Sequence, residues 1–399
     1  MGSSHPPHIC LVTEFPLVLD GRILNQAYTL SQAGYRVSIV DQSVPHDPDP
    51  LADLHRRLPA WTSTSCHVVR MAAHESAVRA ALFRALQKPA RPLSRWLVTL
   101  TLQQLRADAY QARSVETLRT VIPVVRRSGA KVLYDVRDFD TPHLLQTRST
   151  RKRRHVVAAE RRAMPYVAAL TTVNESLARL VADYYKVPPP VVILNCKLVG
   201  APESADLPNL RQQIGLAPGV ALLVFTGVTT HSRGLPVVLI AAGRMPEVHV
   251  AFIGVHDHSG ELMRLARGAG AETRVSFHPP VAAFDVPVYI RSADAAIIAA
   301  APVNPNQVSA LPNKLFEAVA AHLPLIASDI PEQRRIVEAY RIGALFDSDD
   351  PDELEHAIHT VLADRDTFQR NVRAASQELC WEREGVKYLE VYRRLIGTP

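Results

Sequence analysis

The sequence lacks the features that mark membrane-spanning and secreted proteins. Its apolar runs are broken by Gly, Pro or charged residues before they reach the about 18–20 residues of a membrane span. The first residues, MGSSHPPHICLVTEF, show no basic region followed by an apolar core and a cleavage site. Cysteine is scarce, and no pair has a spacing typical of a metal site: Cys10, Cys66, Cys196 and Cys380. These absences favour a cytoplasmic protein with free thiols.

A pattern typical of nucleic-acid binding is also missing. The arginines are scattered, and the basic run RKRRH at 151–155 contains no interleaved aromatic residues. Charge is nevertheless uneven, because residues 1–200 hold 27 Lys and Arg against 15 Asp and Glu (+12), whereas residues 201–399 hold 18 against 24 (−6). The basic first half indicates an anionic partner, such as a phosphate, an acidic acceptor or a membrane surface, or else an ordinary solvated surface. We expect no nucleic acid as partner.

Short apolar runs alternate with helical patterns along most of the chain, which is typical of α/β proteins with parallel sheets. In the first half, a helical pattern begins at Gly21 and stops at Gly34. Strands are expected there at 8–13, 35–41, 108–112, 131–136, 169–173 and 191–195. A break rich in small, polar and Pro residues follows at 195–208. Further strands are then expected at 221–227, 248–254, 273–279, 294–300, 324–329 and 343–347.

This alternation predicts two doubly wound, Rossmann-like α/β domains. The first comprises residues 1–200 and the second residues 201–378, with a last helix at 379–399. With 399 residues and 47% apolar content, the chain can bury two cores. Ligands bind at the carboxyl ends of the strands in such sheets, so we expect the two sheets to face one cleft.

The stretch LPNKLFEAVA at 311–320 predicts a helix that begins without a side-chain cap. Pro312 suits the first helical position, and Leu311 before it cannot accept a hydrogen bond from the helix end. The exposed N–H groups would bind phosphate together with the positive end of the helix dipole, and they belong to Asn313, Lys314 and Leu315. Lys314 would add a full charge, and Glu317 one turn later could accept from the two hydroxyls of a ribose. The alternative is a solvated helix end with Glu317 on the surface.

A second turn in the same half has a comparable pattern. In FTGVTTHSRG at 225–234, a strand ends at Gly227 and a helix begins near Gly234, with Arg233 between them. A strand, a loop of small residues, a cation and a helix N-terminus form an anion site, although the loop is not the GxGxxG of dinucleotide-binding proteins. Two such turns in one domain indicate a diphosphate held from two sides.

These motifs resemble the nucleotide-sugar-binding domain of retaining GT-B glycosyltransferases of family 4. The resemblance rests on the glycine turn with Arg233-Gly234, the strand AFIG ending at Gly254, the PNKLFE helix, and LPLIASD after it. It continues in CWEREGVKYLEVYRRL at 380–395, which is similar to a last helix that crosses back onto the first domain. LDGRILNQAYTLSQAGYRVSIV, KVLYDVRDFDTP and TTVNESLARLVADYY match in order in the first domain. Only about 42–107 falls outside the resemblance.

The resemblance implies a set of donor-binding residues. Glu317 would hold the donor ribose, and Arg233 would neutralise the departing diphosphate. Lys314 and the backbone around it would bind the diphosphate or the transferred sugar, with Leu311, Asn313 and Leu315. Phe277 or His278 would lie near the base, and the remaining donor residues are Gly227, Gly254 and Ser309. Members of the family generally need no metal, so no metal or other cofactor is expected.

The sequence departs from the family pattern at several positions. Ser309 stands where the first Glu of the family's Glu pair would be, and Val228 where a second basic residue usually lies. Gln111 and Arg113 fall where the family often has an HxH, and Arg137-Asp138 where it often has HE. The histidines that could replace the missing one are His67, His74 and His143.

The resemblance implies sugar transfer with retention from a UDP- or GDP-sugar. The departing phosphate oxygen can take the acceptor's proton, so a protein base is not obligatory, and the acceptor could be a small soluble anion or a sulfur nucleophile in small-molecule biosynthesis. We assign Arg233, Lys314 and Arg113 to catalysis, and acceptor binding to Glu14, Arg113, Arg137 and Asp138. Peripheral membrane contact is possible but not favoured, because no amphipathic anchoring helix is evident. Two alternatives are a non-catalytic nucleotide-binding partner protein and a nucleotide-sugar 2-epimerase.

Overall fold

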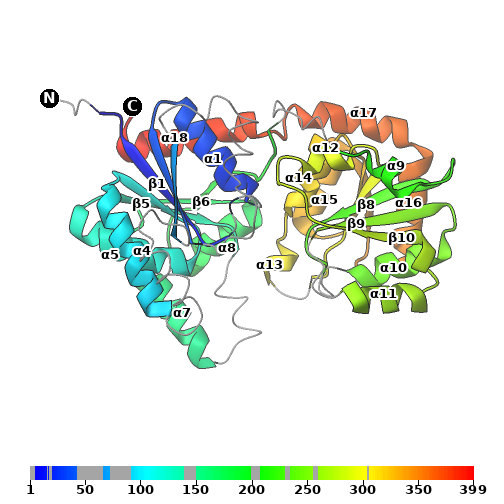
Figure 1. Ribbon diagram of the computed structural model, residues 1–399, viewed down its shortest axis with the longest axis horizontal. Coiled ribbons are helices and arrows are strands. Elements are labelled where there is room, and N and C mark those ends of the chain that lie inside the picture. The colour runs from blue at the N-terminus through cyan, green and yellow to red at the C-terminus, as the bar shows by residue number, and fades with distance from the viewer. Residues whose placement is uncertain are drawn as a thin grey trace. The chain divides into compact units, whose positions relative to one another are not determined.

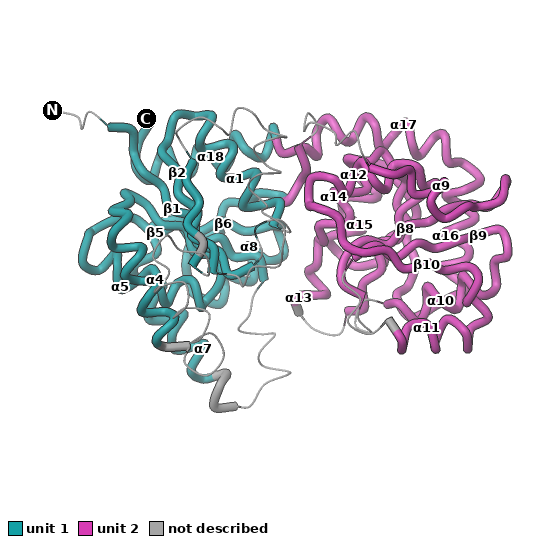
Figure 2. Tube along the Cα trace, viewed as in Figure 1, with its two compact units in different colours: residues 1–194, 382–399 teal, residues 195–381 magenta. Residues whose placement is uncertain are grey.

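The protein is described from a computed structural model, in which the described residues are 5–15, 17, 20–42, 66–71, 91–138, 150–198, 207–229, 234–254, 259–302 and 305–399. The chain forms two compact units, drawn in different colours in Figure 2. Unit 1 consists of Met1–Leu194 and Glu382–Pro399, and unit 2 of Asn195–Trp381. The chain therefore enters its second unit a few residues earlier than the predicted boundary at 200, within the stretch that the sequence marks as a break.

Among the described residues, unit 1 contains a seven-stranded parallel sheet in the order β3-β2-β1-β4-β5-β6-β7. The strands are β1 His8–Thr13, β2 Arg36–Asp41, β3 Cys66–Arg70, β4 Ala109–Ala112, β5 Lys131–Val136, β6 Ala169–Thr172 and β7 Val191–Val192. The first two run in register, with His8 opposite Arg36 and Thr13 opposite Asp41. The sequence did not predict β3, and the strand predicted at 191–195 is shorter than expected.

The helices of unit 1 lie on both sides of this sheet (Figure 1). They are α1 Gly21–Gln32, α4 Arg91–Leu105, α5 Val115–Ser128, α7 Thr150–Ala163, the 3-10 turn η4 Met164–Tyr166, α8 Glu175–Tyr185 and α18 Trp381–Ile396. Helix α5 shows how the sequence sets its ends. Ser114 accepts a hydrogen bond from the Thr117 N–H at 3.1 Å, and Gly129 ends the helix in the left-handed conformation, at φ 75°. Its apolar face packs in a core with α4 and β4.

Unit 2 has a six-stranded parallel sheet in the order β10-β9-β8-β11-β12-β13 among the described residues. Its strands are β8 Ala221–Thr226, β9 Val248–Ile253, β10 Val275–His278, β11 Ala295–Ile298, β12 Leu325–Ser328 and β13 Gly343–Phe346. All six were predicted, although β10, β11 and β12 are each shorter than the apolar run that predicted them. The strand order reverses between β8 and β11, and a sheet of this type binds ligands beside such a reversal.

Helices cover both faces of the unit 2 sheet, with α10 and α11 on one side of β8–β10 and α12, α14 and α15 on the other (Figure 1). Their bounds are α9 Leu210–Ile214, α10 Leu235–Arg244, α11 Ser259–Gly268, the 3-10 turn η6 Glu272–Arg274, α12 Val286–Ile290, α13 Pro305–Val308, α14 Asn313–Ala320, α15 Pro331–Tyr340, α16 Pro351–Ala363 and α17 Arg365–Ser376. The predicted architecture of two doubly wound α/β units is confirmed.

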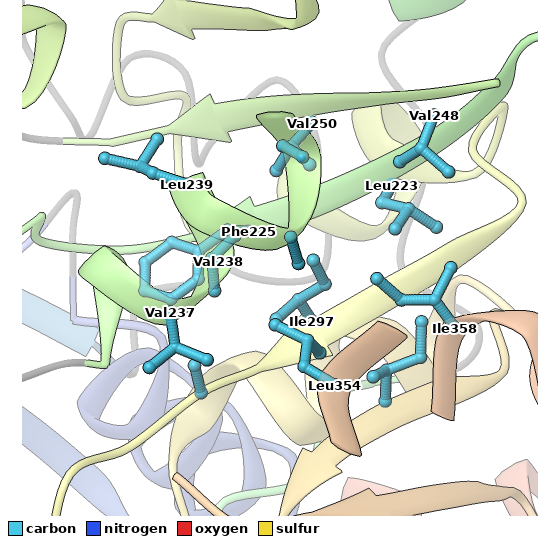
Figure 3. Packing of buried hydrophobic residues seen from close by; sticks show 14 of the residues in the cluster. Leu223, Phe225, Val237, Val238, Leu239, Val248, Val250, Ile297, Leu354 and Ile358 are labelled. Carbon is cyan, nitrogen blue, oxygen red and sulfur yellow. The ribbon is translucent and has the colours of Figure 1, made fainter. Parts of the chain in front are cut away.

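The core of unit 2 is almost wholly apolar on the face covered by α10 and α16. Figure 3 shows how side chains from the strands meet those from the two helices, with Val237 to Leu239 on α10 and Leu354 and Ile358 on α16. Ile297 and Leu223 are fully buried between them. Burying a side chain of this size contributes about 1.5–3 kcal/mol each, so this core fixes the strand ends from which the site is built.

Candidate functional site

Two glycines end neighbouring strands of unit 2 and bring their backbones into close contact. Gly254, after β9, has φ 148°, and a Cβ at this position would lie 2.1 Å from the carbonyl oxygen of Gly227, after β8. Gly227 has φ 107°, and its N–H donates to the Ile253 carbonyl at 2.8 Å. A Cβ on Gly227 would meet no described atom within 4 Å. Glycine is therefore required at 254 by a clash and at 227 by backbone conformation, with open space beside it.

Helix α14 begins one residue later than the sequence predicted. Pro312 is the N-cap, with φ −76° and ψ 152°, rather than the first helical residue, and Leu311 is not the cap. The correction has a physical reason, because an extended Pro312 still offers its carbonyl to the Leu315 N–H at 3.0 Å. Among the described side chains none caps the helix, so its first N–H groups are not satisfied by a cap.

The residues around this helix start divide between the surface and the core. Asn313 is exposed, and its Oδ1 accepts a hydrogen bond from Nδ2 of Asn195. Leu311 and Leu315 are buried, so only their backbone can face a ligand. Ser309 is half-buried in the turn after α13.

Lys314 points into unit 2. Lys314 is only 7% exposed. Its Nζ donates a hydrogen bond to the Ala299 carbonyl at 3.2 Å and lies 3.5 Å from the centre of the Phe225 ring. A cation over an aromatic face is stabilised when it is removed from water. The charge therefore lies beneath the carboxyl ends of β8 and β11, and its contact with a phosphate stays a prediction.

Glu317 is held by two side chains at the end of β8. Its Oε2 accepts from Thr226 Oγ1 at 2.7 Å, and its Oε1 lies 3.0 Å from the ammonium of Lys197. The Glu317 side chain is 12% exposed, so the alternative that it lies on the surface is wrong. Sequence reasoning missed Lys197, because it lies in the stretch interpreted as a break and belongs to no motif.

The two residues predicted near a base lie at the end of β10. Phe277 is half-buried and stacks on Phe252, with ring centres 5.1 Å apart. His278 is buried, its Nε2 lies 3.0 Å from Ser276 Oγ, and its carbonyl accepts from the Gly254 N–H. Base recognition by either side chain stays a prediction.

The second predicted anion site is only partly described. Arg233 lies outside the described residues, whereas Gly234 is the N-cap of α10 at φ 69°. A Cβ at Gly234 would lie 3.4 Å from that of Ala299, so the start of α10 packs closely against the end of β11. Val228, which replaces a basic residue of the family pattern, is 42% exposed.

In unit 1, the predicted acceptor-binding arginines meet on one carboxylate that the sequence did not single out. Asp20, at the start of α1, forms ion pairs with Arg113 after β4 and with Arg137 after β5, the latter at 2.9 Å. Arg113 Nη1 also donates to Thr13 Oγ1 at 2.9 Å, and its guanidinium lies 4.7 Å from the centre of the Phe15 ring. Nη2 of Arg113 is buried and has no hydrogen-bond partner among the described residues.

The charges around Arg137 are of both signs. Removal from water and the nearby charge of Arg22 lower the pKa of Arg137 to about 10, while Asp138 and Glu14 act in the opposite direction. Asp138 is exposed and Glu14 half-buried. The predicted acceptor residues Glu14, Arg113, Arg137 and Asp138 thus lie at the carboxyl ends of β1, β4 and β5 in one mixed cluster.

A buried ion pair joins helix α1 to strand β5 of unit 1. Arg22 donates through Nε and Nη2 to the two oxygens of Asp135, both at 2.8 Å, and each side chain is at most 1% exposed. Asp135 also accepts from Gln26 and Thr171, so its carboxylate receives four hydrogen bonds. Burial alone would raise the pKa of Asp135, but the charge and hydrogen bonds of Arg22 outweigh burial and lower it. Sequence reasoning read Asp135 only as part of a strand.

Gln111 continues this network to the last helix. Its Nε2 donates to Gln26 Oε1 at 2.8 Å, and its Oε1 accepts from the hydroxyls of Tyr388 at 2.6 Å and Tyr392 at 3.1 Å on α18. Gln111, at the position where the family often has histidine, is therefore hydrogen-bonded to three buried side chains of unit 1. Of the histidines considered as substitutes, His67 is exposed on β3, and His74 and His143 lie outside the described residues.

Within the described part of the chain, no three His, Cys, Asp or Glu side chains gather in a way that could hold a metal ion. In the same residues, no helix is long and apolar enough to span a membrane.

Comparison with known proteins relates the chain to glycosyltransferases. Residues 206–378 match the model of the glycosyl transferases group 1 family, and this match covers most of unit 2. The chain is also 29% identical over 239 residues to a D-inositol 3-phosphate glycosyltransferase of Xylanimonas cellulosilytica, which is 57% of this chain and 56% of that protein. A second such enzyme, of Geodermatophilus obscurus, is 26% identical over 45% of this chain and 41% of its own length. The matches thus span about half the length of these relatives.

Solved structures show the same fold over both units of the chain. Sucrose-phosphate synthase from Thermosynechococcus elongatus has a TM-score of 0.76 at 16% identity, covering 98% of this chain and 100% of that one. Anabaena HepE in complex with UDP and glucose has a TM-score of 0.73 at 16% identity, with the same coverage. The predicted GT-B fold and the resemblance to GT-B glycosyltransferases are confirmed.

Proposed function

We propose that this chain transfers a hexose, with retention, from a nucleoside diphosphate sugar to a small anionic acceptor. The observation that carries the proposal is the Glu317 carboxylate, held by Thr226 beside the open turn at Gly227 and one turn inside the uncapped helix α14. A carboxylate accepts hydrogen bonds from a vicinal diol, and the N–H groups at a helix start donate to an anion. This arrangement fits the ribose and the diphosphate of one nucleotide.

We propose UDP as the nucleotide part of the donor. Anabaena HepE, a structural neighbour with a TM-score of 0.73, was solved with UDP-glucose as well as with UDP and glucose. The likeness to HepE is one of fold, so the proposal rests on the donor-site geometry of unit 2 and uses UDP-glucose as the first donor to test.

In the proposed reaction, the bond between the sugar C1 and the diphosphate oxygen breaks, and its electron pair leaves with the diphosphate. The acceptor oxygen forms the new bond on the same face of the sugar, and its proton passes to the departing phosphate oxygen. Negative charge develops on the diphosphate, so the N-termini of α10 and α14 stabilise the transition state more than the ground state. Arg233 and Lys314 would add positive charge, and we propose that no metal is needed.

The cluster around Asp20 suits an acceptor that carries both an anion and hydroxyl groups. Arg113 has a buried nitrogen atom without a hydrogen-bond partner among the described residues, and Arg137 is 22% exposed, so both guanidiniums can donate to an acceptor anion. The carboxylates of Glu14 and Asp138 can accept from hydroxyl groups. Since two sequence relatives are named for D-inositol 3-phosphate, we propose a phosphorylated polyol as the acceptor class.

The test is an acceptor screen with a defined donor. The purified protein is incubated with UDP-glucose or GDP-mannose and with D-inositol 3-phosphate, free inositol, hexose phosphates and small thiols, and products are identified by mass spectrometry. Transfer to a phosphorylated polyol, with an anomeric proton coupling in the product that shows retention, supports the proposal. If thiols are preferred, the acceptor is a sulfur nucleophile and not a phosphorylated polyol. Nucleotide binding without transfer or donor hydrolysis would favour the alternative of a non-catalytic nucleotide-binding partner protein.

A further inference from the structure

Lys197 is fixed at both its backbone and its side chain. It lies three positions after Leu194, where the chain leaves unit 1, and its residue is 7% exposed. Its carbonyl accepts from the Trp381 N–H at 2.9 Å, and its backbone pairs with Cys380 in a parallel bridge. Its ammonium lies 3.0 Å from Glu317 Oε1. Lys197 is therefore held by three residues of unit 2, namely Glu317, Cys380 and Trp381.

The Lys197 ammonium determines how the Glu317 carboxylate is presented. A carboxylate has two oxygens with about four lone-pair sites. Thr226 occupies one site on Oε2 and Lys197 one on Oε1, so the plane of the carboxylate is set by two fixed donors from different segments. Sites remain on each oxygen for two further hydroxyl donors. A ribose presents its 2′ and 3′ hydroxyls as such a pair.

Charge supports the same conclusion. The Glu317 side chain is 12% exposed and the Lys197 side chain 8%, so both are largely removed from water. A charge in such a place needs a partner, and removing one member of the pair leaves the other without compensation. Without Lys197, the Glu317 carboxylate would lose one of its two fixed donors and would be free to rotate away from a diol.

We propose that Lys197 is a positioning residue that fixes Glu317 for the 2′ and 3′ hydroxyls of the donor ribose. The inference rests on the proposed function, since it assumes a nucleotide at Glu317. Lys197 acts through Glu317 and not on the reacting atoms. The neighbouring contact of Asn195 with Asn313 holds the first residue of α14 from the same segment. The short segment 195–197 therefore supports the donor helix at two points.

The test compares binding of UDP and 2′-deoxy-UDP by isothermal titration calorimetry to the wild type, Lys197→Met and Lys197→Arg. We expect the wild type to prefer UDP by about 10-fold or more, because the deoxy nucleotide leaves a site on Glu317 unfilled. Lys197→Met should lower affinity for UDP and bring the two nucleotides to within about 2-fold of each other. Lys197→Arg keeps a cation and should restore most of the preference.

A matched control is Lys387→Met, which removes another lysine from an ion pair, with Glu384 at 2.7 Å on α18. It should leave both affinities unchanged. If Lys197 has a purely structural role, Lys197→Met should lower the affinity for both nucleotides by the same factor. An unchanged preference for UDP in Lys197→Met therefore overturns the inference.

Failure of the inference is distinguishable from failure of the proposed function. If the wild type binds neither UDP nor GDP, the donor site itself is wrong. If it binds UDP with the expected preference and Lys197→Met keeps that preference, only the role of Lys197 is wrong. Should Lys197→Met not fold, as judged by circular dichroism, Lys197→Gln is measured in the same way, since it keeps a donor and removes the charge; full preference in that variant also contradicts the inference.

Discussion

The two units share a parallel, doubly wound sheet but form their candidate sites by different means. In unit 2, the neighbouring strands β8 and β9 are followed by glycines whose backbones are in close contact, and helix α14 begins without a side-chain cap. In unit 1, the strand ends carry arginines and carboxylates that pair with one another across the sheet, as Asp20 does with Arg113 and Arg137. One site depends on how closely the backbone approaches, and the other on how buried charges are paired.

This difference indicates which kind of substitution destabilises each unit most. Backbone sites fail when a side chain fills the space, because a Cβ cannot be accommodated without moving a strand. Sites of paired charges fail when one member is removed, because the other is left buried and uncompensated.

The largest expected effect is on unit 1. Asp135→Ala removes the acceptor of four hydrogen bonds and leaves the Arg22 guanidinium buried without its charge partner. We expect the free energy of unfolding of unit 1 to fall by about 3–5 kcal/mol. Hydrogen exchange read by mass spectrometry separates the two units and should show faster exchange in β5 and α1, with little change in β8 and β9. Equal acceleration in both units would show that the buried pair does not stabilise unit 1 in particular.

The next effect concerns the backbone contact in unit 2. In Gly254→Ala, the new Cβ would lie 2.1 Å from the Gly227 carbonyl oxygen at a φ that alanine rarely adopts. We expect the unfolding free energy of unit 2 to fall by about 3 kcal/mol. Gly227→Ala is the matched control, because it has a positive φ but no described atom within 4 Å, and should lose about 1 kcal/mol. Urea denaturation, monitored by hydrogen exchange in each unit, measures the loss of unfolding free energy in both variants.

A third prediction uses pH and His8 in β1. Arg36 Nη2 lies 2.8 Å from its Nδ1, its Nε2 lies 2.8 Å from Ser38 Oγ, and burial followed by the charge of Arg36 lowers the pKa of His8 to about 4. An unfolded histidine has a pKa near ~6.5, so the unfolded state binds the extra proton between these values. The contribution of neutral His8 to the free energy of unfolding of unit 1 is therefore fully present above about pH 6.5, and it is lost as the pH drops towards 4.

Between pH 7 and pH 5, we expect His8 to account for a loss of about 2 kcal/mol in the unfolding free energy. His8→Gln should flatten this dependence while lowering stability at pH 7. Denaturation curves at several pH values test it, and an unchanged slope in His8→Gln would show that another group is responsible.

The smallest effect is on acceptor choice. Arg137→Gln removes a partly exposed cation beside Asp20 while leaving Arg113 in place. We expect the KM for a phosphorylated polyol to rise about 10-fold, with little change for its unphosphorylated counterpart. Steady-state kinetics with the two acceptors measure the ratio. A uniform rise in both KM values would mean that Arg137 shapes the site without binding the anion.

Much of unit 2 could be predicted because its signals are local. The PNKLFE helix, the strand-end Gly227 and Gly254, and all six strands are each readable within about ten residues. The errors were small, such as Pro312 serving as the cap of α14. Lys197 could not be predicted, since it is 120 positions away from Glu317 and no pattern joins them.

Unit 1 was predicted less completely for the same reason. Its strands were readable as apolar runs, except β3, but Asp20, Arg113 and Arg137 come from three separate loops. The buried pair of Arg22 and Asp135 looks, in sequence, like one charge at a helix start and one at a strand end. Only burial shows that the two must meet.

The sequence by itself determined the two α/β units, most of their strands and the place of helix α14, because periodicity and turn residues act over a few neighbouring positions. The tertiary structure alone decided which charges are paired, which side chains hold Glu317, and why Gly254 has no alternative. Those outcomes depend on distances between atoms far apart in the chain, which parallel strands bring together only when the sheet has formed.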